Sequence, residues 1–317
     1  MNEYDLYAEA VLKERLIRIR NVIRDYGEDQ FYVSFSGGKD STVLSALVDM
    51  ALPGNKIPRL YADTGIELNM VRDFVKQLQK NDDRIIMLPP KVPIKKMLEK
   101  EGYPFKSKFH SSVVDKFQRS GMSKWVSIYI MKEPAASGEF VKGDHACPKI
   151  LLHQFEEGYP LRISQRCCDR LKKDPLNAWA KEHNRPYPII GIMPSEGGQR
   201  ATAQCLAFRG TKFHAFQPLV RVDKEWEDWF IEKYNVQICD IYKPPYNFKR
   251  TGCKGCPFSL ELQDQLDQMK QYFPAEYRQC EKIWAPVYAE YRRLGYRLRP
   301  DVGQTDIFDF IGGKADV

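Results

Sequence analysis

The chain has no long hydrophobic run, and this absence excludes a protein with helical membrane spans. None of its apolar segments approaches the roughly 20 residues that a transmembrane helix needs. The opening stretch, MNEYDLYAEAVLKERL, is charged and amphipathic, so it lacks the apolar core of a signal peptide. We therefore expect a cytoplasmic protein that does not associate with membranes.

The sequence also lacks internal repeats and low-complexity tracts. Its 317 residues, 43% of them hydrophobic, suffice for one large core, or for one core with an appended region. The net charge of +7 is spread in short pieces, which suits an anionic ligand or a modest nucleic-acid surface. A solvated basic surface is the more frequent cause of such a charge.

Ten residues near the N-terminus, YVSFSGGKDS from Tyr32 to Ser41, combine a buried-strand pattern with a polar, glycine-rich turn. The run STVLSALVDMAL that follows has helical periodicity, so the segment predicts a strand, a tight turn and a helix. Gly37 and Gly38 allow a sharp turn, and Lys39 adds a positive charge at the positive end of the helix. The pattern predicts a phosphate-binding loop, in which Asp40 could orient a magnesium ion. A glycine-rich turn without a ligand is the alternative.

The rest of the chain alternates strand and helix patterns. We expect a helix over about 3–26, a strand over 57–62 that ends at Asp63, a helix over 71–80, and strands at RIIML and YPIIGIM. We expect PSEGGQRATAQCLAF to form a turn and a helix. This alternation predicts an α/β fold with a doubly wound, mostly parallel sheet, followed by a helix-rich C-terminal region.

The expected domain organisation follows from where the periodicity weakens. Residues 1–260 would form the nucleotide-binding domain, with an irregular insertion at about 103–165, and residues 261–317 would form a helical extension. The insertion could be a lid, a partner surface or a tolerated surface loop.

The chain has eight cysteines, four of which occur in two pairs. A cytosolic location argues against disulfides and for free thiols, a metal site or redox chemistry. Cys167 and Cys168 are adjacent, and Cys253 and Cys256 have C-x-x-C spacing. Four thiolates are what a [4Fe–4S] cluster or a structural zinc ion requires. Adjacent cysteines favour a cluster over zinc, because a cluster offers each thiolate its own iron atom; a metal-free dithiol or buried structural cysteines are further alternatives.

Several of these motifs resemble one known family. SFSGGKDS is similar to the pyrophosphate-binding loop shared by adenine-nucleotide alpha-hydrolases and phosphoadenosine-phosphosulfate (PAPS) reductases. CCDRLKKDPL, GIMPSEGGQRAT and NFKRTGCKGCPF resemble segments of adenosine-phosphosulfate (APS) reductases, including their Cys-Cys and C-x-x-C cluster ligands. The likeness extends from about residue 28 to 260, apart from the insertion, and it implies an adenine-nucleotide alpha-hydrolase-like fold.

The resemblance implies roles for individual residues. Phosphates would be held by Ser36, Gly37, Gly38, Lys39, Asp40 and Ser41. Asp63 would border the nucleotide, and Lys172, Lys173 and Arg200 would meet anionic groups of the substrate, with Lys39, Asp40 and Arg200 as the catalytic candidates. Glu196 matches the family pattern before Arg200, whereas Gly197 replaces the usual serine. Cys167, Cys168, Cys253 and Cys256 would bind the cluster.

The sequence departs from the true reductases in one respect. Those enzymes attack the substrate's sulfur with a cysteine on a mobile C-terminal tail, and this sequence has no cysteine after Cys280, which lies in a helical pattern. Cys147, close to His145, is a candidate substitute, while Cys205 and Cys239 fit a core.

These observations predict an enzyme of sulfur metabolism, with three alternatives for its function. It could reduce a sulfonucleotide (APS or PAPS) with a thiol donor, in the manner of an oxidoreductase. It could use ATP and magnesium to transfer sulfur from a sulfur-donor protein to tRNA or DNA. It could also be a non-catalytic nucleotide-binding regulator. A homo-oligomer is compatible with each alternative.

Overall fold

The computed structural model describes residues 2–194 and 202–300. The chain divides into two compact units, which are described separately below. Unit 1 comprises Met1–Ile94 and Cys168–Lys254, and unit 2 comprises Lys95–Cys167 and the residues from Gly255 onwards. Each unit is therefore assembled from segments that lie far apart in the sequence.

Unit 1 contains all the named strands and about half of the helices. Its strands are β1 (Phe31–Phe35), β2 (Arg59–Ala62), β3 (Ile85–Leu88), β4 (Tyr187–Ile190), β5 (Leu206–Arg209) and β6 (Lys212–Phe216). Its α-helices are α1 (Glu3–Tyr26), α2 (Lys39–Ala51), α3 (Asn69–Asn81), α8 (Asp174–Glu182) and α9 (Lys224–Lys233). It also contains the 3₁₀ turns η1 (Glu28–Gln30) and η7 (Asp240–Tyr242) and the π-helical turn η4 (Asp169–Lys173).

Unit 2 is helical in the part that the structure describes. Its helices are α4 (Ile94–Glu101, which starts at the last residue of unit 1), α5 (Lys108–Ser120), α6 (Lys124–Tyr129), α10 (Leu262–Tyr272), α11 (Pro274–Ile283) and α12 (Ala285–Arg293). It also contains the 3₁₀ segments η2 (Gly143–His145) and η3 (Lys149–Phe155). The short helix α7 (Arg166–Cys168) ends at the first residue of unit 1.

The six strands of unit 1 form one sheet in the order β3-β2-β1-β4-β6-β5. All neighbouring strands are parallel except β5 and β6, which form an antiparallel edge hairpin. From β1 the chain first moves outward to β2 and β3, and it later returns to β4 on the other side of β1. The expectation of a doubly wound, mostly parallel sheet is confirmed, and the strand order reverses between β1 and β4.

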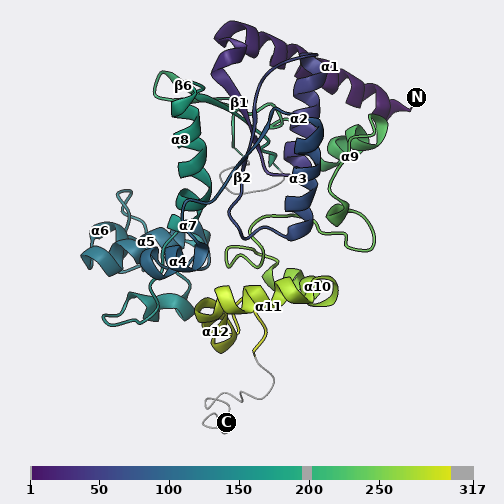
Figure 1. The fold of residues 1–317 in the computed structure, drawn as a ribbon. Coiled ribbons are helices and arrows are strands. Elements are labelled where there is room, and N and C mark those ends of the chain that lie inside the picture. Colours follow the sequence, from purple (N-terminus) through teal and green to yellow (C-terminus); the bar gives the residue numbers. More distant parts are fainter. Residues whose placement is uncertain (1, 195–201, 301–317) are drawn as a thin grey trace. The chain divides into compact units, whose positions relative to one another are not determined.

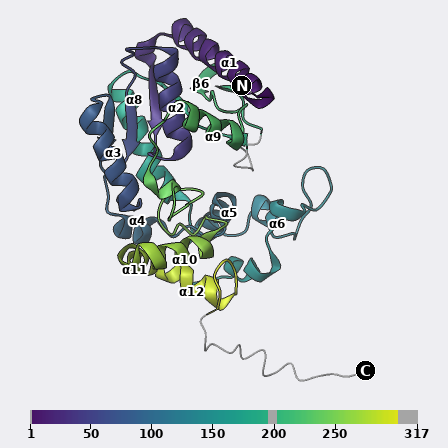
Figure 2. The same cartoon turned by 90° about the vertical axis from the view of Figure 1, so that its right-hand side faces the viewer.

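Alternating residues of the strands face two helical layers. Phe31 and Val33 belong to a core that includes residues of α1, α2 and α9, whereas Tyr32 packs with Leu60 and with Trp179 of α8. Figure 1 shows α8 on one side of the strands and α2, α3 and α9 on the other. Figure 2 shows α1, α2 and α9 grouped together on their side of the sheet. Burial on both faces explains why these strands are continuous hydrophobic runs.

Two expectations about local structure were wrong. The residues expected to form a helix after YPIIGIM end in strand β5, which pairs with β6 through a turn at Gly210, whose φ is +60°. The alternation in KFHAF and the glycine before it are the signals of this hairpin. The insertion is also more regular than expected, because it contains the 13-residue helix α5.

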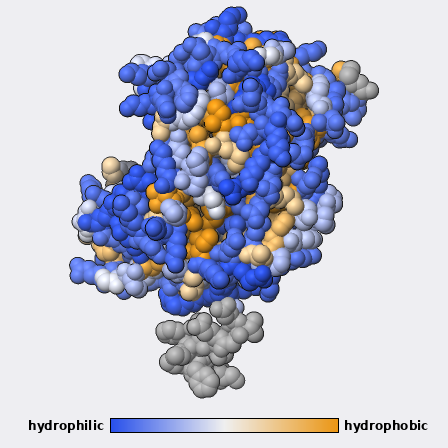
Figure 3. All heavy atoms as spheres, in the orientation of Figure 1, coloured by the Kyte–Doolittle hydropathy of each residue, from blue (hydrophilic) through white to orange (hydrophobic). Residues whose placement is uncertain are grey.

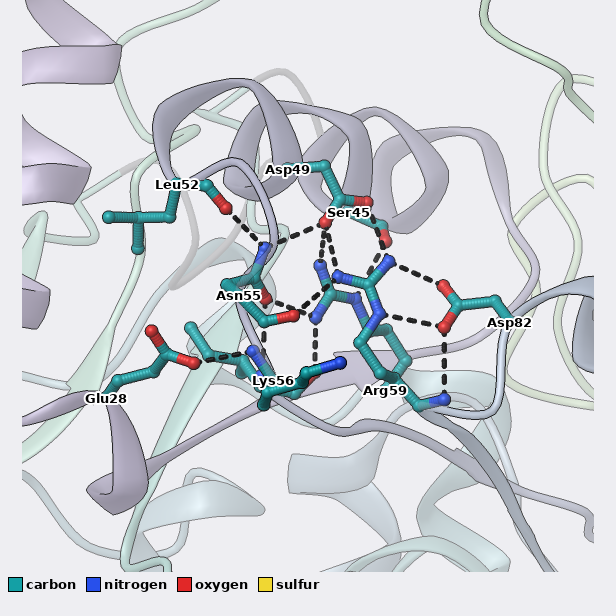
Figure 4. Close-up of polar contacts among 10 residues, drawn as sticks. Glu28, Ser45, Asp49, Leu52, Asn55, Lys56, Arg59 and Asp82 are labelled. Atoms are coloured by element: carbon teal, nitrogen blue, oxygen red, sulfur yellow. Dashed lines mark hydrogen bonds and ion pairs between the residues drawn. The ribbon is translucent and has the colours of Figure 1, made fainter.

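A buried arginine near the start of β2 anchors the sheet edge opposite the glycine-rich loop. Arg59 is fully buried and pairs with Asp49 of α2 at 2.7 Å, while it donates to Asn55 Oδ1 at 2.8 Å. Figure 4 shows this network, in which Asp82 completes the anionic side. Burial lowers the pKa of Arg59 to about 10, and the Asp49 carboxylate opposes that shift. The network ties α2, β2 and the start of β3 together.

Unit 2 has a buried histidine at its centre. His110 of α5 is fully buried, with Nδ1 2.8 Å from the Tyr129 hydroxyl and Nε2 2.7 Å from Gln154 Oε1. Both ring nitrogens are thereby used by a neutral imidazole. Burial lowers the pKa of His110 to about 4.

The surface is predominantly hydrophilic on the face drawn in Figure 3. None of the helices within residues 2–194 and 202–300 has both the length and the hydropathy of a membrane span.

His110 makes the stability of the protein depend on pH. In the unfolded chain its pKa returns to about 6.5, so between pH 6.5 and 4 the unfolded state binds a proton that the folded state does not. Stability should therefore fall as the pH decreases through this window, by at most about 1.4 kcal/mol per pH unit. We expect His110→Gln to flatten this dependence, measured as urea-unfolding free energies near pH 7 and near pH 5. Equal slopes for the variant and the wild type would contradict the assignment, whatever the absolute stability of the variant.

Candidate functional site

The glycine-rich loop after β1 is held in shape by its own serines. The Ser36 and Ser41 hydroxyls lie 3.0 Å apart, and the Ser41 hydroxyl donates to the Gly38 carbonyl at 3.0 Å. The Gly38 N–H donates to Ser36 Oγ at 3.3 Å. These bonds preform a turn between the carboxyl end of β1 and the first residue of α2, Lys39.

The loop lies where the strand order reverses, which is the usual ligand position in open α/β sheets. No side chain among the described residues caps the N-terminus of α2, so its positive end is available to an anion. Gly37 has a φ of +68°, and a Cβ on it would lie 2.6 Å from Val75 Cγ2. A Cβ on Gly191, just after β4, would lie 3.1 Å from the Asp40 carbonyl oxygen. Close packing therefore requires glycine on both sides of the switch point.

Lys39, predicted to bind phosphate, is paired with carboxylates of α9. Its ammonium lies 2.8 Å from Asp228 Oδ1 and 3.9 Å from Glu227 Oε2. Asp228 is exposed, so a phosphate that displaces it would let the carboxylate return to water. The Lys39 charge is thus held at the loop without being committed to a buried partner.

Glu227 is a functional candidate that sequence analysis missed. Only 1% of it is exposed, and its Oε1 has no hydrogen-bond partner among the described residues. Burial raises the pKa of Glu227 to about 8, a shift strengthened by the Asp40 carboxyl within hydrogen-bonding reach and opposed by Lys39. In the sequence Glu227 resembles any acidic residue of a solvated helix face, and only the packing of α9 on α2 distinguishes it.

Tyr242 and Thr251 are a second pair that sequence analysis missed. The Tyr242 hydroxyl accepts a hydrogen bond from the Lys39 backbone N–H and also contacts the Thr251 hydroxyl. Burial raises the pKa of Tyr242 to about 12. Thr251 lies in the NFKRTGCKGCPF segment, whose cysteines drew attention to metal binding and away from the loop.

Asp63 lies at the carboxyl end of β2, where it closes a turn. Its Oδ1 accepts from the Gly65 N–H at 2.9 Å, and its Oδ2 pairs with Arg72 at 2.8 Å. The Thr64 hydroxyl donates to Glu67 Oε1 at 2.6 Å within the same turn. Both oxygens of Asp63 are therefore used by the protein, which gives this residue a structural role at the ligand edge of the sheet.

Two of the four motif cysteines lie together in unit 1. Cys253 interacts electrostatically with Cys168 and Lys172, and its thiol lies within hydrogen-bonding reach of the Thr64 hydroxyl. Desolvation raises the pKa of Cys253, and Lys172 is the largest opposing influence. Cys253 also forms an antiparallel backbone bridge with Glu67. Residues distant in sequence thus converge beside the turn after β2, as the cysteine pattern predicts.

The other two motif cysteines belong to unit 2. Cys167 is buried, and Cys256 follows Gly255, whose φ is +60° and whose carbonyl accepts from the Tyr288 hydroxyl. The Tyr291 hydroxyl donates to the Pro257 carbonyl at 2.9 Å. Helix α12 therefore fixes the second half of the C-x-x-C turn.

The remaining predicted positions divide into two groups. Lys173 is exposed and pairs with Asp169 at 2.7 Å, so its ammonium is engaged within η4. Arg200, with Glu196 and Gly197, lies outside the described residues.

Cys147 does not have the surroundings of a nucleophile. Burial raises the pKa of its thiol to about 12, with Lys106 as the largest opposing influence, whereas His145 is exposed. Cys280 is fully buried in α11. A buried thiol with a raised pKa is inert.

Within each unit, no group of three or more His, Cys, Asp or Glu among its described residues is arranged to hold a metal ion. No disulfide joins the eight cysteines, all of which are described. The thiols needed for metal ligation have therefore not been consumed by disulfides.

Comparison with known families decides the identity of the loop region. Residues 30–125 match the model of the phosphoadenosine phosphosulfate reductase domain. This chain carries a PAPS reductase domain. The match includes the glycine-rich loop, the turn at Asp63 and helix α5.

An uncharacterized protein of Methanocaldococcus jannaschii is 32% identical to this chain over 266 residues. The alignment covers 83% of this chain and 48% of the relative, so the chain spans about half the length of the curated relative that it matches.

Three solved structures have distant similarity to the chain. The PAPS reductase of Candida auris is 12% identical, with a TM-score of 0.44 over 80% of this chain and 96% of that one. The FMN adenylyltransferase of Candida glabrata is 12% identical, with a TM-score of 0.46 over 80% and 65%. The U34-tRNA thiolase NcsA of Methanococcus maripaludis, solved with its [4Fe-4S] cluster, is 14% identical, with a TM-score of 0.35 over 91% and 80%. All three scores are too low to assign an activity to this chain.

Replacing Gly37 by alanine should destabilise the PAPS reductase domain. The positive φ alone costs about 1 kcal/mol or more, and the contact with Val75 adds to it. Gly54→Ala is the matched control, because Gly54 has a φ of +77° and nothing lies within 4 Å of its added Cβ. We expect the loss of unfolding free energy, measured by urea denaturation, to be clearly larger at Gly37. Equal losses would show that the loop can move away from α3 at no cost.

Proposed function

We propose that this protein is an enzyme that uses an adenine nucleotide to activate an acceptor for sulfur transfer. The observation that carries the proposal is the preformed loop at the switch point, which combines an uncapped helix N-terminus, Lys39 and the carboxyl groups of Asp40 and Glu227. The carboxyl groups disfavour a bare phosphosulfate, whereas they suit a nucleotide that arrives with a metal ion. This balance favours ATP over APS or PAPS as the nucleotide.

In the proposed reaction, an oxygen of the acceptor attacks the α-phosphorus of ATP. A new oxygen–phosphorus bond forms as the bond between the α- and β-phosphates breaks, and pyrophosphate leaves. A sulfur nucleophile at the sulfide level then bonds to the activated atom and displaces AMP, so no external oxidant or reductant is needed. The acceptor class that we propose is nucleic acid, tRNA or DNA, supplied with sulfur by a donor protein.

The residues of the loop would act on the leaving pyrophosphate. The backbone N–H groups at the start of α2 and the Ser36 and Ser41 hydroxyls would stabilise its developing negative charge. Lys39 would exchange Asp228 for a phosphate oxygen. The Tyr242 hydroxyl, which accepts from the Lys39 N–H, would hold that end of the loop in place.

We further propose that Cys167, Cys168, Cys253 and Cys256 bind a [4Fe–4S] cluster. The proximity of Cys168 and Cys253 in unit 1 supports this assignment, and Cys167 is covalently adjacent to Cys168, so its Cα lies about 3.8 Å away. Lys172 would compensate the negative charge of the thiolates. When bound, the cluster would supply a place that holds sulfur.

Sulfonucleotide reduction is the second candidate function, favoured by the family of the matched domain. Among the described residues, the surroundings of Cys147 and Cys280 provide no activated thiol for it. We therefore rank it below ATP-dependent transfer.

Anaerobically purified protein should contain about four irons per chain and absorb broadly in the visible range. The double variant Cys253→Ser, Cys256→Ser should lose both signals, because two thiolate ligands are removed. Cys205→Ser, outside the two pairs, should keep them. Stoichiometric zinc without colour would replace the cluster by a structural zinc site.

Wild-type protein should release pyrophosphate from ATP when tRNA or DNA is present. Lys39→Ala should reduce the rate at least tenfold, because the leaving group loses a positive partner. Lys56→Ala, an exposed lysine remote from the loop, should have the wild-type rate. Release of sulfite from APS or PAPS by a dithiol, with no pyrophosphate release, would favour reduction instead. Nucleotide binding without either turnover would point to a regulator.

A further inference from the structure

The most unusual polar group in unit 1 is the Glu227 carboxyl. It is almost completely buried, and its Oε1 has no hydrogen-bond partner among the described residues. Leaving an acceptor unsatisfied in the interior costs about 1 to 3 kcal/mol. A structural role alone gives no reason to retain it, because glutamine or an apolar residue could occupy this place at lower cost.

The charges around Glu227 are unbalanced. The carboxyl groups of Glu227, Asp40 and Asp228 surround a single ammonium, that of Lys39. When all three carboxyls are ionised, this group has a net charge of −2. It lies at the N-terminus of α2, where the proposed function requires further negative charge from phosphates. A positively charged ligand would remove both conflicts.

We propose that Glu227 and Asp40 together bind a divalent cation of the Mg²⁺ class, which bridges the protein to the phosphates of the nucleotide. Their carboxylates come from different helices, α9 and α2, and lie within hydrogen-bonding reach of each other. Hard cations prefer such oxygen ligands, and Mg²⁺ usually takes one or two carboxylates and completes its shell with water and phosphate oxygens. This habit explains why the described residues of unit 1 contain no three-residue metal group.

The inference deepens the proposed function, on which its bridging role rests, and it assigns Glu227 as a positioning residue for the metal–nucleotide complex. The competing explanation is that Glu227 only pairs with Lys39, whose ammonium is 3.9 Å away. In that case Glu227→Gln would change the affinity for nucleotide equally with and without metal. A metal ligand instead makes the effect of the substitution conditional on the metal.

The first experiment measures metal binding. Mn²⁺ alone, and Mn²⁺ with ATP, would be titrated into wild-type protein, Glu227→Gln, Asp40→Asn and Glu225→Gln, with free Mn²⁺ followed by electron paramagnetic resonance. Glu225 is the matched control, since it is an exposed glutamate two residues away on the same helix. We expect one Mn²⁺ per wild-type chain beyond that bound by ATP itself. The affinity should fall at least tenfold in Glu227→Gln and Asp40→Asn and remain unchanged in Glu225→Gln.

The second experiment measures ATP affinity by calorimetry, in Mg²⁺ and in EDTA. Wild-type affinity should fall at least tenfold in EDTA, whereas the affinity of Glu227→Gln should be insensitive to Mg²⁺. Thermal unfolding curves would show that each variant is folded.

The outcomes separate the two proposals. Equal Mn²⁺ affinity in wild type and Glu227→Gln would overturn the cation site, and ATP binding that ignores Mg²⁺ in the wild type would do the same while leaving the nucleotide site intact. Mn²⁺ binding that depends on Glu227 in a protein that binds no ATP would support the cation site and contradict the proposed function.

Discussion

The positive end of helix α2 is the feature on which the rest of the site depends. It lies between β1 and β4, where the strand order reverses, and no side chain among the described residues caps it. Peptide dipoles and unsatisfied N–H groups concentrate positive potential there. Negative groups have gathered around it accordingly: the carboxyls of Asp40, Glu227 and Asp228 and the hydroxyl oxygen of Tyr242. The same potential would attract the phosphates of a nucleotide.

The second constraint is the convergence at the turn after β2. Asp63 and Thr64 close this turn internally, and Cys253 pairs with it through backbone and side chain. Cys168 and Lys172 approach the same thiol from the start of the segment that leads into α8. The π-helical turn η4 lies in that segment, and such turns occur often at functional sites. A nucleotide loop and a cysteine pair thus both belong to the carboxyl-end edge of one sheet.

Much of the fold could be predicted from the sequence, because the parallel strands are continuous apolar runs and the main helices are strongly periodic. The strand at Arg59–Ala62, the helices α1 and α3, and the reversal-type sheet all follow from that pattern. The hairpin of β5 and β6 did not, since the preceding residues have helical composition while pairing with an edge strand decided their conformation. The Arg59 network was equally hidden, because a lone arginine in a strand gives no sign of the aspartates that approach it from α2 and the turn before β3.

The sequence by itself determined the loop from Ser36 to Ser41, the paired cysteines and the sheet that presents them. These features depend on residues close together in the chain, where glycine conformations, spacing and periodicity have direct meaning. Only the tertiary structure decided that Lys39 is paired with Asp228, that Tyr242 contacts the loop, and that Glu227 is buried beside Asp40. Each of these contacts joins residues about 190 to 200 positions apart. Burial and charge pairing at such separations are properties of the packed chain, and no local pattern encodes them.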